Sequence, residues 1–182
     1  MTEVSERYRQ RAQLFTDKVE GVADDAWDNQ SPCEDWTARD VVGHVVDTTG
    51  MFFGFIDQPP PTGPSVDDDP VGAWRAARDA VQAALEDPSV ATKAYEGHFG
   101  PTTFEKSVGQ FLSGDLVMHN WDLSRATGQD DTIDPVEVSE MLVAMEPMDE
   151  LLRSPGAFGP KIEPPPGADE QTRLLCFLGR KV

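Results

Sequence analysis

The sequence has few basic residues and no long apolar run, and each shortage excludes a class of partner or location. Lys and Arg total 15 against 33 Asp and Glu, a formal net charge of -18. A surface of this sign repels nucleic-acid phosphates and anionic membranes, so we expect neither as a partner. No apolar run approaches the roughly 20 residues of a membrane-spanning helix. The N-terminus is charged from Glu3 onward, so we expect a cytoplasmic protein without a signal peptide.

Cysteine is also scarce, which argues against a disulfide scaffold. Cys33 and Cys176 lie far apart in the sequence, and a cytoplasmic protein keeps both as thiols. Cys33 precedes an expected helix start and could bind a metal or react, but Glu34 and Asp35 beside it disfavour the thiolate form. We therefore favour a structural role for Cys33.

What the sequence does contain is helical periodicity within a globular composition, with 182 residues of which 38% are hydrophobic. This length suits a single domain over residues 1–182, and neither a strand pattern for an α/β sheet nor a phosphate-binding loop is present. Residues 89–106 fit either a short hairpin or an irregular loop. The apolar spacing predicts an all-α bundle, with helices over Glu6–Val22, Ala38–Ile56, Val71–Leu85, Ser107–Gly128 and Pro135–Arg153, and a short C-terminal helix over Ala168–Leu178.

Capping residues support several of these helix ends. Thr37 is a good N-cap with Asp40 at the third helical position, close to a capping box. Pro70 suits the first position of the third helix, and Gly128 suits the end of the fourth. The proline-rich segments around 58–70 and 155–167 are expected to be loops.

The fourth helix carries an anomaly on its apolar stripe, which is formed by Val108, Leu112, Leu116, Leu123 and Ala126. Asp115 and His119 fall on the same inward sector, one turn apart. A carboxylate on a core-facing stripe is costly to desolvate unless it is neutralised. A divalent metal held by Asp115 and His119 and a ligand from another helix would neutralise it. The alternatives are a self-satisfied Asp115–His119 pair or a stripe that faces solvent.

Three further residues could belong to such a site. His44 lies on the flank of the apolar face of the second helix, where a ring at the core margin could become a ligand. His98 lies in the uncertain segment and could be a solvated loop residue, a mobile ligand or an acid–base group that faces the substrate. Asp122 could orient His119 from behind or face a substrate, or it could be a solvated helix carboxylate.

Three motifs in this order resemble the DinB/YfiT-like superfamily of metal-binding helical bundles. They are SPCEDWTARDVVGHVVD, GDLVMHNWDLSRATG and the C-terminal LLCFLGR. The chain is most similar to the actinobacterial branch that includes the N-terminal domain of mycothiol-dependent maleylpyruvate isomerase. The resemblance implies a four-helix bundle of up-down-down-up topology, here with the extra short C-terminal helix.

The resemblance also implies a site and a chemistry. It implies that His44, Asp115 and His119 are ligands of a divalent metal, zinc or nickel, and that mycothiol is the co-substrate of a thiol S-transferase or isomerase acting on a small electrophile. The isomerase carries a glutamate at the position of Asp115 and an additional C-terminal domain, so the isomerase reaction itself is the least supported choice. The alternatives are a non-catalytic metal-binding or stress-response bundle and a metal-dependent hydrolase. A homodimer is compatible with the sequence.

Overall fold

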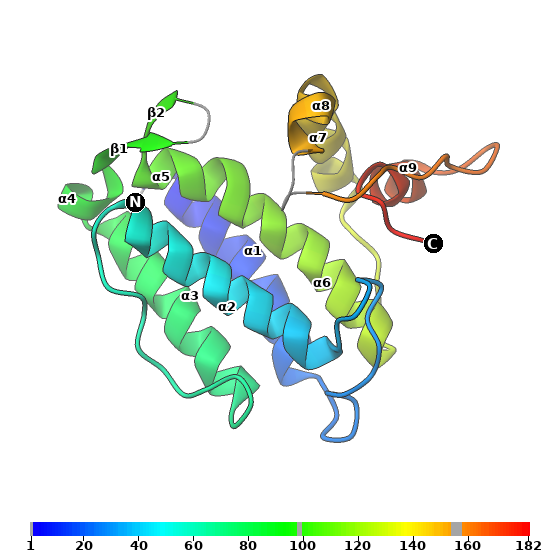
Figure 1. Ribbon diagram of the computed structural model, residues 1–182, viewed down its shortest axis with the longest axis horizontal. Coiled ribbons are helices and arrows are strands. Elements are labelled where there is room, and N and C mark those ends of the chain that lie inside the picture. Colours follow the sequence, from blue (N-terminus) through cyan, green and yellow to red (C-terminus); the bar gives the residue numbers. More distant parts are fainter. Residues whose placement is uncertain (1, 98–99, 154–157) are drawn as a thin grey trace. The chain divides into compact units, whose positions relative to one another are not determined.

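The computed structural model describes residues 2–97, 100–153 and 158–182, and most of this chain is helical (Figure 1). The chain forms two compact units, Met1–Asp131 and Thr132–Val182, which are described separately here. The single domain over residues 1–182 therefore stays a prediction. No helix in the described ranges combines the length and the apolar character that crossing a membrane requires.

Four long helices build the first unit and enclose its core. They are α1 (Glu3–Glu20), α2 (Ala38–Phe55), α3 (Pro70–Glu86) and α6 (Ser113–Thr127). Helices α1 and α2 each contact both α3 and α6, so all four share one apolar interior. Phe15, Val45, Trp74 and Leu116, one from each helix, are fully buried in it. The all-α class is confirmed, whereas the up-down-down-up order stays a prediction.

Local capping chemistry sets the ends of the two helices that matter most below. At the start of α2, the Thr37 hydroxyl accepts from the Asp40 amide at 3.2 Å, and the Asp40 carboxylate accepts from the Thr37 amide at 2.8 Å. This reciprocal pair confirms the predicted capping box. Helix α6 ends at Gly128, whose φ of 69° lies in the left-handed region that glycine adopts without strain.

The segment between α3 and α6 contains a hairpin and an unusual helix start. It comprises α4 (Pro88–Ala91), β1 (Ala94–Gly97), β2 (Gly100–Thr103), α5 (Phe104–Ser107) and the π-helix η1 (Val108–Leu112). Strands β1 and β2 pair antiparallel, which selects the hairpin among the two alternatives. The predicted helix start at Ser107 is wrong, because Thr103 caps the helical backbone from Phe104. The predicted apolar stripe from Val108 to Ala126 is buried throughout.

The second unit contains α7 (Pro135–Met145), the 3-10 helix η2 (Glu146–Met148), α8 (Asp149–Leu152) and α9 (Glu170–Phe177). Helices α7 and α9 pack against each other. The predicted single helix over Pro135–Arg153 is wrong, because regular α-helix ends at Met145 and gives way to η2, whose Pro147 has no backbone N–H to donate. The predicted short C-terminal helix is present as α9.

Candidate metal centre

Helices α2 and α6 bring three predicted ligands to one point in the first unit. His44 projects from α2, and Asp115 and His119 project from consecutive turns of α6. His119 Nε2 lies 3.3 Å from Asp115 Oδ1, and His44 Nε2 lies 3.6 Å from Asp115 Oδ2. One donor atom from each residue lies within 4.8 Å of the other two.

These separations can be tested against the size of a metal ion. Metal–donor distances of about 2.0–2.1 Å in a tetrahedral zinc site put neighbouring nitrogen and oxygen ligands about 3.3 Å apart. The two nitrogen–oxygen separations of 3.3 and 3.6 Å are close to this value. Asp115 Oδ2 is also buried without a hydrogen-bond partner. A buried carboxylate whose two oxygens each face one imidazole nitrogen, with Oδ2 lacking a hydrogen bond, is suited to binding a cation, so the residues fit a divalent metal.

Exposure increases across the three side chains. The His119 side chain is 5% exposed, that of Asp115 18% and that of His44 35%. The candidate centre therefore begins inside the core at His119 and reaches solvent at His44. A small molecule would approach from the His44 side. The Thr48 hydroxyl lies 3.4 Å from His44 Nε2, within hydrogen-bonding distance.

Electrostatics couple Asp115 and His119. Burial raises the pKa of Asp115, but the attraction of His119 and then of His44 outweighs it and holds this pKa well below the usual range. Burial likewise lowers the pKa of His119, but Asp115, and then Asp122 and Cys33, together raise it well above the usual value. Without a metal, an imidazolium–carboxylate pair is therefore favoured. A metal would compete with the proton on His119.

Asp122 lies behind His119, on the side away from Asp115. Its Oδ2 lies 2.9 Å from His119 Nδ1, and its side chain has no exposed surface. The solvated-carboxylate alternative is therefore wrong. A hydrogen bond from Nδ1–H to Asp122 leaves the Nε2 lone pair directed at Asp115, which is the tautomer a metal on that side needs.

Two more residues adjoin the centre. For Cys33 the sequence left metal binding open and favoured a structural role, and Trp36 was not singled out by any sequence pattern. The Cys33 thiol donates to Asp122 Oδ2 at 3.3 Å. The Trp36 ring centre lies 4.8 Å from that of His44 and 6.0 Å from that of His119, so the indole forms a wall beside both imidazoles. Both residues precede α2 in the loop 30–37. No periodic pattern covers that loop, so only the tertiary structure reveals their position.

Hydrogen bonds within this loop fix where its side chains lie. The Gln30 amide donates to the carbonyls of Cys33 and Trp36, and the Ser31 amide donates to the Trp36 carbonyl at 2.8 Å. Asp35 adopts a φ of 63°, a left-handed conformation that aspartate tolerates better than most residues. The loop therefore holds Cys33 and Trp36 in a defined place against α6.

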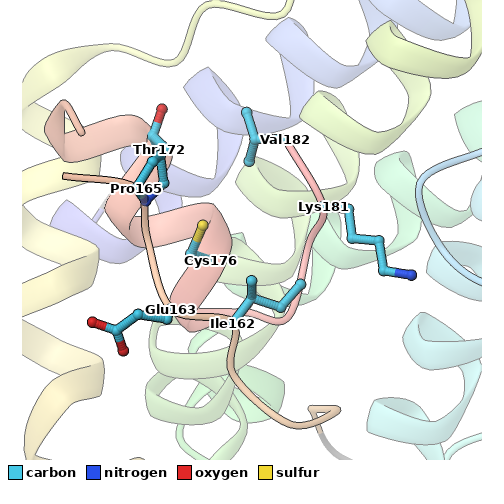
Figure 2. A pocket seen from close by; sticks show the side chains of 7 residues that line it. All are labelled: Ile162, Glu163, Pro165, Thr172, Cys176, Lys181 and Val182. Atoms are coloured by element: carbon cyan, nitrogen blue, oxygen red, sulfur yellow. The ribbon is translucent and has the colours of Figure 1, made fainter. Parts of the chain in front are cut away.

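The remaining candidates lie elsewhere. His98 lies outside the described residues, so its role stays a prediction. Cys176 lines a pocket of about 430 Å³ in the second unit, together with Glu163 and Lys181 (Figure 2). Burial, and then the Glu163 carboxylate, raise the pKa of its thiol. Within the described ranges, Cys176 belongs to no group of three residues at metal-ligand distances.

Comparison with known proteins supplies a family. The family model for the mycothiol maleylpyruvate isomerase N-terminal domain matches residues 8–124, a segment that contains His44, Asp115, His119 and Asp122. Two uncharacterized proteins of Mycobacterium tuberculosis, from two strains, are each 29% identical over 187 residues, covering 95% of this chain and 96% of the relative. No solved structure matches the chain significantly.

Proposed function

Because the chain belongs to the mycothiol maleylpyruvate isomerase N-terminal domain family, we propose that it binds one divalent metal through His44, Asp115 and His119. We propose further that it uses a small thiol such as mycothiol to transform a small electrophile. The observation that carries the proposal is the three donor atoms within 4.8 Å of one another, with Asp115 Oδ2 buried and without a hydrogen bond. Imidazole and carboxylate donors suit zinc or nickel. We also propose that the chain is a single domain whose four-helix bundle has up-down-down-up topology.

The chemistry follows from the donor set. Three protein ligands are typical of catalytic zinc sites, whereas structural sites use four. When bound, the ion supplies Lewis acidity that lowers the pKa of a thiol coordinated to it. The reaction class we propose is therefore thiol transfer to, or thiol-assisted isomerisation of, an electrophile.

The protein's own residues would each do one task. Asp122 holds the proton on His119 Nδ1, 2.9 Å away, so that Nε2 is free to bind the ion. Trp36 covers one side of the imidazole pair with an apolar ring and keeps water from that side. His44, the most exposed of the three ligands, marks the side on which thiol and electrophile would arrive.

Metal analysis of protein purified without a histidine tag tests the binding step. We expect about one equivalent of zinc or nickel in the wild type, loss of the metal from this centre in His44→Ala, and loss of all bound metal in His119→Ala. Asp115→Asn removes the third ligand of this centre. Its matched control is Asp47→Asn, because Asp47 is exposed on α2 and its substitution makes the same change of charge. Wild-type protein that folds normally yet binds no metal on titration would refute the proposal.

Turnover is tested separately, by offering the metal-loaded protein mycothiol and a panel of electrophiles. We expect thiol-dependent consumption of an electrophile that Asp115→Asn abolishes and Asp47→Asn retains. Metal retained without any turnover would favour a non-catalytic binding or stress-response role. Consumption of substrate without added thiol would favour a metal-dependent hydrolase. A maleylpyruvate assay with mycothiol decides whether the reaction is that of the isomerase.

A further inference from the structure

The imidazole of His119 faces a second set of metal-binding atoms on its other nitrogen. Nε2 faces Asp115, whereas Nδ1 lies 2.9 Å from Asp122 Oδ2. Cys33 Sγ lies 3.3 Å from that same oxygen. One donor atom from each of Cys33, His119 and Asp122 lies within 4.8 Å of the other two. A sulfur, a nitrogen and an oxygen donor therefore converge behind the proposed centre.

We propose that this second set binds a thiophilic divalent cation, Zn²⁺ or Cd²⁺, in place of the ion at the first centre. Tetrahedral zinc puts a nitrogen and an oxygen ligand about 3.3 Å apart, and a sulfur and an oxygen ligand about 3.5 Å apart. The corresponding separations here are 2.9 and 3.3 Å. Outward movements of a few tenths of an ångström would make room for the ion.

Charge and donor type distinguish the second set from the first. A Cys33 thiolate and the Asp122 carboxylate together carry two negative charges, which neutralise a dication, whereas the first set has one charged ligand, Asp115. Asp122 has no exposed surface, and full neutralisation matters most where the dielectric is low. The thiolate also gives the second set a preference for soft cations, which the imidazole and carboxylate donors of the first set lack.

The two positions exclude each other because they share His119. A neutral imidazole has one lone pair, on either Nε2 or Nδ1. Binding on the Cys33 side releases the thiol proton and the Nδ1 proton of the His119 imidazolium to solvent, and the remaining imidazole proton stays on Nε2. Nε2 then no longer binds an ion beside Asp115. The chain therefore holds one cation at a time, and a thiophilic ion on the Cys33 side blocks the first centre.

Cys33 is placed so that an ion can reach it. Its side chain is half-buried, in contrast to the 0% and 5% exposed side chains of Asp122 and His119. The loop 30–37 that carries it is held by the Gln30 and Ser31 hydrogen bonds, so the thiol is presented to Asp122 in a defined position. The ion would enter past the thiol.

Titration of metal-free protein with Cd²⁺ and Co²⁺ tests the inference, read out by sulfur-to-metal charge-transfer absorption. Asp115→Asn disables the first set and leaves the second intact, so we expect one equivalent bound with a strong sulfur band. Adding Cys33→Ser should abolish the band, whereas adding the matched Cys176→Ser should leave it unchanged. His44→Ala is the substitute background if Asp115→Asn does not fold, judged by circular dichroism.

Each outcome is decisive. A sulfur band lost on Cys33→Ser, with one equivalent in total bound by the wild type, supports the second position. No sulfur band in either background, or a band lost on Cys176→Ser instead, overturns it. Two equivalents bound at once by the wild type overturn the mutual exclusion. Cys33→Ser in the wild-type background keeps the first set complete, so its binding of one zinc distinguishes failure here from failure of the proposed function.

Discussion

The two sides of the His119 imidazole differ in how their polar atoms are satisfied. On the Nε2 side, the nitrogen–oxygen separations are 3.3 and 3.6 Å, and Asp115 Oδ2 has no hydrogen-bond partner. On the Nδ1 side, Asp122 Oδ2 lies 2.9 Å from the imidazole and also accepts from the Cys33 thiol. The first side has the spacing of metal ligands, and the second has the spacing of hydrogen bonds.

This difference suggests that the two nitrogens of His119 have separate roles. A histidine ligand needs one nitrogen free and the other one held, and the two carboxylates on α6 provide these two environments three and four residues from His119. On the side that opens to solvent, a carboxylate oxygen of Asp115 lacks a hydrogen bond, whereas on the buried side Asp122 Oδ2 has two. Substitutions that remove one side or both test the comparison.

Removing His119 should have the largest effect, because both sides depend on it. His119→Ala leaves Asp122 fully buried without its imidazole partner, which typically costs about 3–5 kcal/mol of unfolding free energy. Urea unfolding of metal-free protein measures this cost. His44→Ala is the comparison, since His44 is 35% exposed and its pairing should contribute no more than about 1 kcal/mol. Equal losses in the two variants would contradict the difference in burial.

Asp122→Asn should weaken metal binding at the first centre without removing any of its three ligands, His44, Asp115 and His119. The amide oxygen can still accept from Nδ1–H but lacks the carboxylate's charge, so we expect zinc affinity to fall about 10–100-fold. Competition with a chromophoric chelator measures the affinity. The exposed Asp47→Asn should change it little. An unchanged affinity in Asp122→Asn would mean that the charge of Asp122 does not contribute to zinc binding through His119.

The pH dependence of the metal-free protein should follow the imidazolium–carboxylate pairing. The raised pKa of His119 stabilises the fold fully below its usual value of 6.5, and this stabilisation is lost as pH rises through the raised pKa. The lowered pKa of Asp115 stabilises the fold above its usual value of 3.8, and this stabilisation is lost as pH falls through the lowered pKa. Unfolding free energy should therefore be highest between about pH 4 and 6.5 and decline in alkali.

Zinc affinity should depend on pH in the opposite direction to the unfolding free energy of the metal-free protein. Because the ion competes with the proton on His119, zinc affinity should increase as pH rises through the same range. Isothermal titration calorimetry in buffers of different ionisation enthalpy counts the protons released. Stability of the metal-free protein that rises steadily into alkali would contradict the raised pKa of His119.

Asp115→Glu should have the smallest effect of this series. The additional methylene of glutamate shifts the carboxylate by about 1 Å while keeping its charge. We expect metal binding to be retained, with an affinity within about tenfold of the wild type. Chelator competition measures it. Complete loss of the metal would show that the spacing between α2 and α6 accepts aspartate alone.

Much of the fold could be predicted from local signals. The capping box of Thr37 and Asp40, the N-terminal Pro70 of α3 and the glycine end of α6 depend on neighbouring residues only, and the structure confirms them. The interruption of the α-helix by η2 has a local cause, because Pro147 lacks a backbone N–H. The π-helix at Val108–Leu112 had no local signal, since its burial pattern continues the stripe of α6.

The sequence by itself determined that Asp115 and His119 stack on one helix face, because a separation of four residues is one helical turn wherever the helix lies. It also determined the acidic surface and the helical class. Only the tertiary structure decided that His44 faces this pair, that Asp122 is fully buried, and that Cys33 and Trp36 adjoin the site. Those contacts depend on how α2 and the loop 30–37 pack against α6, and packing is set by the whole core rather than by any local stretch of residues.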